Sequence, residues 1–195
     1  MQEAVQKFKE TLDHSRTVAV KTGNTKDISK ILSAHIFHSA FLELEKQSSI
    51  DCGEIDNSTK NFLKILLGEI RNSKTPEHTL IKIDTQKIPV SELKYEKEGT
   101  ILKIILQSGE GYIDPAKIQI EKEKIPVDLL ILVDPEEKEI ELIIENTPHK
   151  EVVKITTKDK DIGIKTFEIV SALTKETVDK YKEAFWVLLN ETSQF

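Results

Sequence analysis

The sequence has little of several things that mark particular classes of protein. It contains one cysteine, Cys52, which excludes an internal disulfide and a cysteine-built zinc site and fits a reducing cytoplasm. Aromatic residues make up 6% of the chain, and no apolar run is long enough to span a bilayer. The N-terminus is charged and lacks the apolar core of a signal peptide. These absences predict a cytoplasmic protein with no membrane span.

The chain also lacks an excess of positive charge. Its formal net charge is −6 and its pI is about 5.5. This argues against binding to extended nucleic acid or to an anionic membrane, because both attract basic proteins. With 195 residues, 38% of them hydrophobic and 32% charged, the chain is long enough to bury a substantial core.

One short stretch dominates the apolar pattern. Residues 127–133 are apolar except for Asp128, and Asp134 and Pro135 follow directly. A continuous apolar run that ends in a turn signal is typical of a strand buried on both faces, as in a parallel sheet covered by helices. Ligands of such sheets bind beyond the carboxyl ends of the strands, so Asp134 lies where chemistry is expected.

The rest of the chain alternates between strands and amphipathic helices. This alternation predicts an α/β fold with a mostly parallel sheet and helices on both faces. The predicted strands are residues 17–22, 48–53, 127–133 and 151–156. The predicted helices are residues 2–14, 27–46, 57–70 and 162–173, a last helix after Thr174, and a short helix or loop after Pro135.

A strand-rich segment interrupts this pattern between about residues 79 and 121. Its predicted strands are short, and residues 97–99 form a tight turn, which predicts a hairpin over residues 93–106. We therefore expect one α/β domain over residues 1–195 that carries an antiparallel β insertion.

Three stretches resemble a known family. Phe8–Val20 is similar to the first helix and strand of the DHH-family phosphoesterases, which include nanoRNases and pAp phosphatases. Ile81–Gly99 is similar to a strand-rich insert of some bacterial members, and Val127–Asp134 is similar to the family's central strand and its metal-binding aspartate. The resemblance is to the family's N-terminal domain and extends over about residues 2 to 175 of this chain. We expect the family's second domain, which grips the substrate, to be absent, because the sequence stops at Phe195.

The resemblance implies a particular metal chemistry, and this chain departs from it. Family members hold two manganese ions with aspartates and histidines, and the metals activate a water and neutralise a phosphate. Here only Asp27 follows the first strand as a candidate ligand, beside Asp134 of the central strand. Where the Asp-His-His motif should follow the strand at residues 152–155, the chain has Thr156, Thr157 and Lys158, although another register brings His149 near that point.

Two functions follow from these departures. The first is a catalytically degenerate DHH-like protein that has no cofactor and binds a protein partner or a small phosphate-bearing ligand. The alternative is a manganese-dependent phosphoesterase that acts on nucleotides or short oligonucleotides through Asp27 and Asp134. Each aspartate also has a purely structural interpretation, Asp134 as a turn residue and Asp27 as an acidic residue in the first turn of a helix.

Lysines near the same edge suggest a third type of site. Lys26 and Lys158 stand close to the positions of the family's metal ligands, and Thr22 and Asn24 lie beside the start of the helix at residue 27. Together with free N–H groups at helix starts, these residues predict a metal-free pocket for a small anion. The alternative interpretation is that the lysines are simply solvated.

The remaining polar candidates favour structural roles. His35 and His38 lie one helical turn apart without a carboxylate to complete a metal motif, which favours buried histidines. The last helix carries Tyr181, Phe185 and Trp186, more apolar surface than one contact stripe needs. This surplus allows a homodimer through that helix, or a helix that covers the sheet of its own chain.

Overall fold

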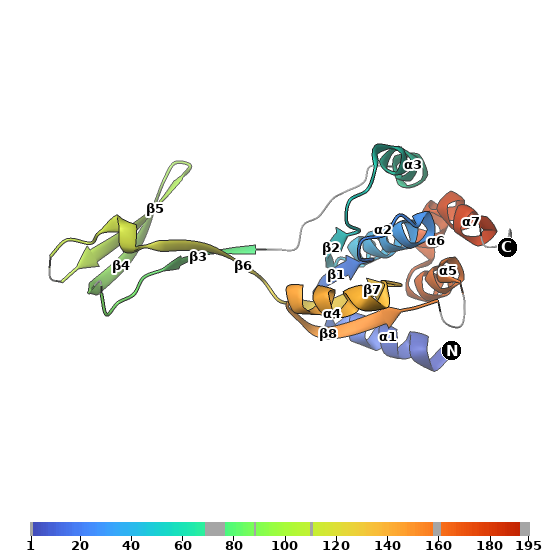
Figure 1. The fold of residues 1–195 in the computed structure, drawn as a ribbon, viewed down its shortest axis with the longest axis horizontal. Coiled ribbons are helices and arrows are strands. Elements are labelled where there is room, and N and C mark those ends of the chain that lie inside the picture. The colour runs from blue at the N-terminus through green and yellow to red at the C-terminus, as the bar shows by residue number, and fades with distance from the viewer. Residues whose placement is uncertain (1, 69–76, 88, 110, 158–160, 192–195) are drawn as a thin grey trace. The chain divides into compact units, whose positions relative to one another are not determined.

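The protein forms two compact units in the computed structural model, which describes residues 2–68, 77–87, 89–109, 111–157 and 161–191 (Figure 1). The first unit comprises Met1–Pro76 and Ile125–Phe195, and the second comprises Glu77–Lys124. The second unit contains the predicted β insertion and is a few residues longer at each end.

The first unit is built on a four-stranded parallel sheet with the strand order β2-β1-β7-β8. The apolar stretch is β7, at the centre next to β1, and the predicted parallel sheet is confirmed. The strands are β1 (Thr17–Lys21), β2 (Gln47–Asp51), β7 (Val127–Val133) and β8 (His149–Ile155).

Helices cover both faces of this sheet, as the α/β pattern predicts. The larger core packs against α1, α2, α3, α5, α6 and α7, whereas α4 alone covers the other face with Ile140, Ile143 and Ile144. The helices are α1 (Gln2–His14), α2 (Ile28–Glu43), α3 (Asn57–Leu67), α4 (Glu137–Asn146), α5 (Ile162–Leu173), α6 (Lys175–Lys180) and α7 (Lys182–Glu191).

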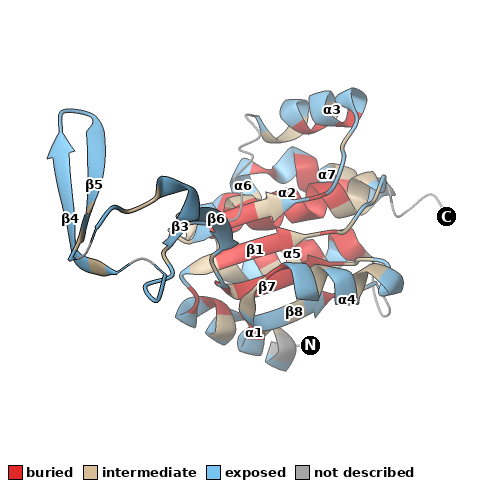
Figure 2. Ribbon diagram, turned by 60° about the vertical axis from the view of Figure 1, so that its left-hand side comes forward, coloured by how far each residue is buried: buried red, intermediate tan, exposed pale blue. Residues whose placement is uncertain are grey.

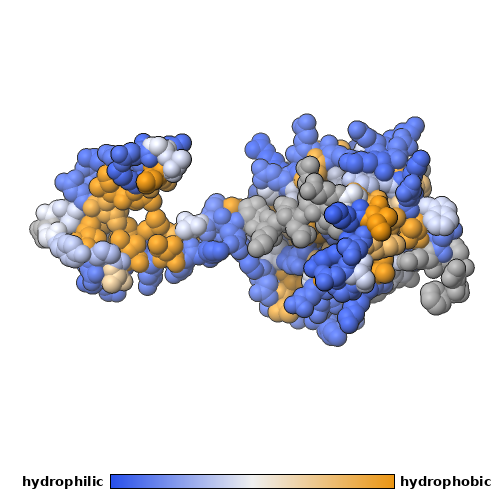
Figure 3. Space-filling model, turned by 90° about the horizontal axis from the view of Figure 1, so that it is seen from above, coloured by the Kyte–Doolittle hydropathy of each residue, from blue (hydrophilic) through white to orange (hydrophobic). Residues whose placement is uncertain are grey.

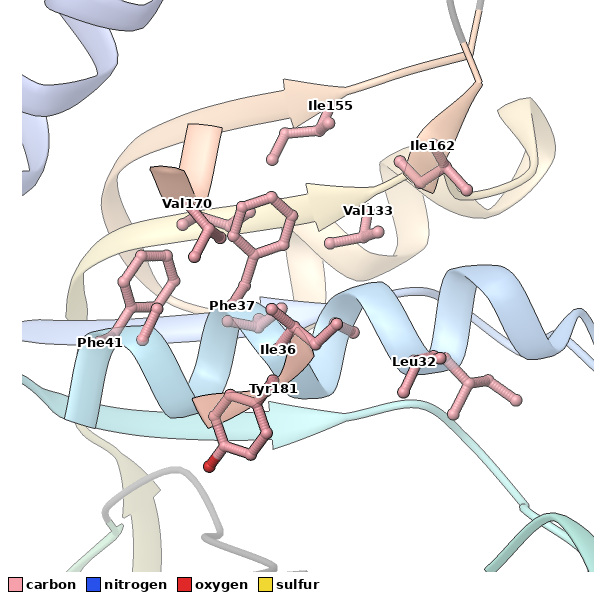
Figure 4. Packing of buried hydrophobic residues seen from close by; sticks show 14 of the residues in the cluster. Leu32, Ile36, Phe37, Phe41, Val133, Ile155, Ile162, Val170 and Tyr181 are labelled. Atoms are coloured by element: carbon pink, nitrogen blue, oxygen red, sulfur yellow. The ribbon is translucent and has the colours of Figure 1, made fainter. Parts of the chain in front are cut away.

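Strand β7 is buried on both sides because its side chains alternate between the two cores. Leu129, Ile131 and Val133 join the larger core, and Leu130 and Leu132 join the smaller one. Figure 2 shows the buried residues concentrated on β1, β7 and the helices beside them. Figure 4 shows the larger core from close by, with aromatic rings from α2 facing the sheet.

Asp128, the one polar residue of this strand, joins β7 to the start of β1. Its carboxylate accepts hydrogen bonds from the backbone N–H groups of Arg16 (2.9 Å) and Thr17 (3.0 Å) and from the Thr17 hydroxyl (3.1 Å). Lys150 Nζ lies 2.7 Å from its other oxygen. Asp128 thus lies near the start of a strand inside the sheet, and its carboxylate is fully hydrogen-bonded there.

The last helix was predicted as one continuous element, and this prediction is wrong. The helical segments α6 and α7 meet at Tyr181, whose φ and ψ of −108° and 27° lie outside the helical range. Tyr181 and Phe185 are buried in the larger core, whereas Trp186 is 68% exposed. The two helices therefore pack into the core of their own chain against α2 and α5, and neither the predicted homodimer nor direct cover of the sheet follows from these contacts.

The second unit consists of two antiparallel pairs of strands. Strands β3 (Glu77–Lys82) and β6 (Gln119–Lys124) form one pair, and β4 (Val90–Glu98) and β5 (Ile101–Ser108) form the other. A short 3-10 helix, η1 (Pro115–Lys117), precedes β6. The predicted hairpin is confirmed, but its turn is at Gly99 and Thr100, later than the predicted turn, and Gly99 has a φ of +60° that favours glycine.

No helix is both long and apolar enough to cross a membrane among the residues that the structure describes.

Candidate functional site

The carboxyl ends of the four parallel strands lie along one edge of the first unit, which we call the carboxyl edge. Strands β1, β2, β7 and β8 end at Lys21, Asp51, Val133 and Ile155. The residues that follow these ends include five of the candidates from the sequence: Thr22, Asn24, Lys26, Asp27 and Asp134. His149 is the first residue of β8 and lies at the opposite edge of the sheet, so the register that brought it to the motif position is wrong.

Asp134 is held by three hydrogen-bonding groups. Its Oδ1 accepts hydrogen bonds from the backbone N–H (2.9 Å) and the hydroxyl (3.1 Å) of Thr157, and its Oδ2 lies 2.9 Å from Lys30 Nζ. Lys30 Nζ also donates to the backbone oxygen of Asp134 at 2.9 Å. The residue has a φ of +44°, which is uncommon for a residue with a side chain. Asp134 thus connects α2 to the ends of β7 and β8.

The charge of Asp134 is balanced by the ammonium group of Lys30. Their side chains are only 15% and 20% exposed. Burial of Asp134 disfavours its ionised form, but the hydrogen bonds from Lys30 and Thr157 outweigh this effect and hold the pKa of its carboxyl below the usual value. The carboxylate is therefore ionised and already paired at neutral pH.

Lys30 reaches Asp134 from the first turn of α2, which Asp27 caps. The Asp27 carboxylate accepts hydrogen bonds from the backbone N–H groups of Ser29 (2.9 Å) and Lys30 (3.3 Å). The sequence placed Asp27 in the first turn of this helix, but in the structure it is the N-cap residue before Ile28, where its carboxylate satisfies free N–H groups of the helix start.

The two candidate metal ligands, Asp27 and Asp134, are therefore bonded to groups of the protein. Within the described ranges, no group of three or more histidine, cysteine, aspartate or glutamate side chains could hold a metal ion. At the position where the family motif was expected, Thr157 donates hydrogen bonds to Asp134. Lys158 lies outside the described residues.

The predicted anion-binding residues divide into a buried and an exposed group. Thr22 is buried, and its hydroxyl donates to the backbone oxygen of Gly23 at 2.9 Å. Asn24 and Lys26 are exposed, and the backbone N–H of Asn24 donates to Glu139 Oε1 at 3.2 Å. Glu139 of α4 thus accepts a hydrogen bond from a backbone N–H group that could otherwise bind an anion.

The loops after β1 and β2 pack closely around this point. Gly23 has a φ of +76°, and a Cβ atom there would collide with the Glu139 carboxylate. Gly53 has a φ of +69°, and a Cβ there would lie 3.0 Å from Asn24 Oδ1. The positive φ favours glycine at both positions, and a side chain at either one would displace Glu139 or Asn24.

Two further lysines at the carboxyl edge are bonded within the protein. Lys21 Nζ lies 3.2 Å from Asp51 Oδ2, and Lys165 Nζ donates to the backbone oxygen of Thr156. The start of α5 is capped by Asp161, whose carboxylate accepts from the Gly163 N–H at 2.6 Å. Carboxylates and carbonyl groups of the chain thus pair with two lysines and with the start of a helix, which an anion at this edge would otherwise contact.

The buried histidines and the cysteine have structural surroundings. His35 is 4% exposed, and burial together with the charge of His38 lowers the pKa of its imidazole to about 4. His38 Nδ1 lies 2.8 Å from the Ser48 hydroxyl. Burial raises the pKa of the Cys52 thiol to about 12, although Thr22 hydrogen-bonds to it, so the thiol is unreactive at neutral pH.

The second unit contains a polar hollow of about 520 Å³. Two of its lysines are neutralised nearby, since Lys82 pairs with Glu121 at 2.5 Å and Lys87 pairs with Asp84 at 3.0 Å. Its lining residues are Lys82, Ile83, Asp84, Lys87, Lys117 and Gln119.

Sequence reasoning missed the two groups that determine the chemistry of the carboxyl edge. The sequence analysis did not single out Lys30 among the lysines near this edge, and it did not consider Glu139. A signal for Lys30 does exist, because a residue in the first turn of a helix after β1 lies beside the end of the neighbouring strand β7. No such spacing identifies Glu139, which reaches the loop after β1 from α4.

Searches with protein-family models, among curated proteins and among solved structures found no match for the chain. The resemblance to DHH phosphoesterases therefore stays a prediction from the sequence.

Proposed function

We propose that this chain is a non-catalytic relative of the DHH phosphoesterases that acts by binding a protein partner. The observation that carries this proposal is the ion pair between Lys30 and Asp134, with 2.9 Å between Nζ and Oδ2. The ammonium group pairs with the aspartate that the resemblance would make a metal ligand, which supports a non-catalytic role.

Two-metal hydrolysis requires carboxylates or imidazoles that are free to bind cations. Asp134 is bonded to Lys30 and Thr157, and the Asp27 carboxylate is bonded to the start of α2. A divalent ion would have to displace an ammonium group that also bonds the backbone of Asp134. This arrangement supports a binding role over the alternative, a manganese-dependent phosphoesterase.

Between the two classes of ligand, the contacts favour a protein over a small phosphate-bearing molecule. An anion near Asn24 and Lys26 would meet the carboxylates of Asp27 and Glu139. The Thr22 hydroxyl is buried and bonded to Gly23. The anion pocket stays a prediction, and titration with inorganic phosphate of the wild type and Lys26→Gln, followed by amide NMR shifts, tests it.

The deciding experiment measures manganese in the purified protein and the hydrolysis of bis-p-nitrophenyl phosphate and pAp with added manganese. Wild type, Asp134→Ala and Asp51→Ala are compared, because both aspartates lie at the carboxyl end of a strand at the same edge and pair with a lysine. We expect no bound manganese and no turnover in any of the three. Bound manganese, with turnover that Asp134→Ala abolishes and Asp51→Ala retains, would show that the protein is an enzyme.

A further inference from the structure

The polar hollow of the second unit differs from much of the surface of that unit. Most of the exposed large hydrophobic side chains among the described residues belong to this unit, and Figure 3 shows hydrophobic atoms gathered over it. The hollow is lined instead by three lysines, an aspartate, a glutamine and one apolar residue: Lys82, Lys87, Lys117, Asp84, Gln119 and Ile83. Its volume of about 520 Å³ is that of a small-molecule site, but its lining is suited to a charged ligand.

Three structural elements hold the backbone around the hollow. Lys82 ends β3 and lies opposite Gln119 of β6, so the two side chains share one face of this strand pair. A hydrogen bond of 3.0 Å from the Lys87 N–H to the carbonyl of Asp84 closes the turn after β3. Lys117 is the last residue of η1, two residues before Gln119. Strand pairing, a turn and a 3-10 helix thus bring lysines from separate stretches of the chain to one hollow.

The lining carries more positive than negative charge. It contains three lysines but only one carboxylate, that of Asp84, which lies 3.0 Å from Lys87 Nζ. Lys82 pairs with Glu121, which does not line the hollow, and Lys117 has no ion pair with any described residue. In a chain with a net charge of −6, the hollow is therefore a local excess of positive charge.

The two ion pairs leave their lysines able to contact a ligand. The four side chains of the Lys82–Glu121 and Lys87–Asp84 pairs are 47–75% exposed. Exposed ion pairs contribute little to stability, so an ammonium group can turn towards a ligand at small cost. The ion pair at the carboxyl edge is different, because both of its side chains are largely buried.

We propose that the hollow binds a small organic anion with two or more negative charges through Lys82, Lys87 and Lys117. Ammonium groups form charge-assisted hydrogen bonds with phosphate and carboxylate oxygens, and a ligand with several such groups can contact lysines of separate elements at once. The amide of Gln119 offers one further donor group. The inference is independent of the function proposed for the carboxyl edge.

The test uses two lysines of the second unit, one inside the hollow and one outside it. Lys117 lines the hollow, whereas Lys122 lies on the face of the β3–β6 pair opposite to that of Lys82 and Gln119. Lys117→Gln and Lys122→Gln therefore remove the same charge at two places. Inorganic pyrophosphate and citrate are titrated into the full chain and each variant at constant ionic strength. Calorimetry measures affinity, amide NMR shifts locate the bound anion, and circular dichroism controls for folding.

We expect the wild type to bind at least one of the two anions saturably, with amide shifts at residues 82–84, 87 and 117–119. Lys117→Gln should weaken binding about tenfold, because it removes a charge-assisted hydrogen bond, whereas Lys122→Gln should change it less than about twofold. Tighter binding of pyrophosphate would support a phosphate-bearing ligand, and tighter binding of citrate a carboxylate-bearing one.

Three results would overturn the proposal. The first is the absence of saturable binding of either anion by the wild type. The second is an unchanged affinity in Lys117→Gln. The third is an equal loss in Lys117→Gln and Lys122→Gln, because the attraction would then depend on the total charge of the unit and not on the hollow.

Discussion

Similar apolar residues are buried in the first unit of this protein and exposed in the second. In the first unit, Leu129 to Val133 of β7 are fully buried, because helices cover both faces of the sheet. In the second unit, β5 also carries a run of isoleucine and leucine but is largely exposed, because its sheet has two strands and no helix packs on it among the described residues of that unit. Burial is thus determined by the layers around a strand and not by its composition alone.

A pair of truncations should give the largest difference between the units. Phe37 is fully buried and stacks on Phe41 with 6.0 Å between ring centroids, so Phe37→Ala should lower the free energy of unfolding by about 3–5 kcal/mol. Ile101 is 60% exposed on the β4–β5 hairpin, so Ile101→Ala should change it by less than about 0.5 kcal/mol. Urea unfolding monitored by circular dichroism measures both values.

If Ile101→Ala destabilised the protein as much as Phe37→Ala, the hairpin would share the core of the first unit.

Much of the first unit was predictable because its pattern is local. The apolar run of β7 is continuous and the helices have clear periodicity, so residues 2–14 and 162–173 were predicted with their observed bounds. The break between α6 and α7 was not predictable, because the apolar spacing continues through Tyr181 without a proline or glycine.

The carboxyl edge was only partly predictable. Parallel strands bring their ends to one edge, so the neighbourhood of Asp134 followed from the strand pattern alone. Its pairing with Lys30 depends on the course of the loop after β7, where Asp134 itself takes a φ of +44°. The sequence carries little information on such loop conformations in residues other than glycine.

Acid should act mainly on the first unit, through His35. Because burial lowers its pKa to about 4 from 6.5, the unfolded chain binds a proton more readily than the folded protein. The free energy of unfolding is therefore unaffected by His35 above pH 6.5 and decreases as the pH falls from 6.5 towards 4. This loss amounts to roughly 3 kcal/mol at most. Urea unfolding at several pH values should show this loss in the wild type.

The matched variants for this prediction are His35→Gln and His78→Gln. His35→Gln should flatten the profile between pH 6.5 and 4, since glutamine does not titrate there. His78 lies exposed on β3 of the second unit, and its substitution should leave the profile of the wild type unchanged. Equal profiles for the wild type and His35→Gln would assign the acid sensitivity to other groups.

An ion pair of the first unit should also contribute more to the free energy of unfolding than an ion pair of the second unit. Asp128→Ala removes the acceptor of the Arg16 and Thr17 N–H groups and the partner of Lys150, which should cost about 1–3 kcal/mol of unfolding free energy. Glu98→Ala removes the exposed partner of Lys103, which should cost less than about 1 kcal/mol. Urea unfolding compares the two variants, and a larger loss in Glu98→Ala would contradict the difference drawn between the units.

Removal of the second unit should have the smallest effect on the first. Glu77 and Lys124 are opposite each other in the β3–β6 register, so the two ends of the second unit lie side by side. A short glycine-serine linker can therefore replace residues 77–124 without pulling residue 125 away from the start of β7. We expect the unfolding free energy of the first unit to change by less than about 1 kcal/mol, because no buried residue of its two cores is removed.

The same deletion separates folding from anion binding, since one protein can be measured for both. Unchanged urea unfolding together with the loss of pyrophosphate and citrate binding would mean that the first unit folds alone and that the second unit holds the anion site. Loss of the cooperative transition would instead mean that the exposed apolar residues of β4 and β5 pack against the first unit in solution. The contrast between a buried β7 and an exposed β5 would then hold only for the two units taken separately.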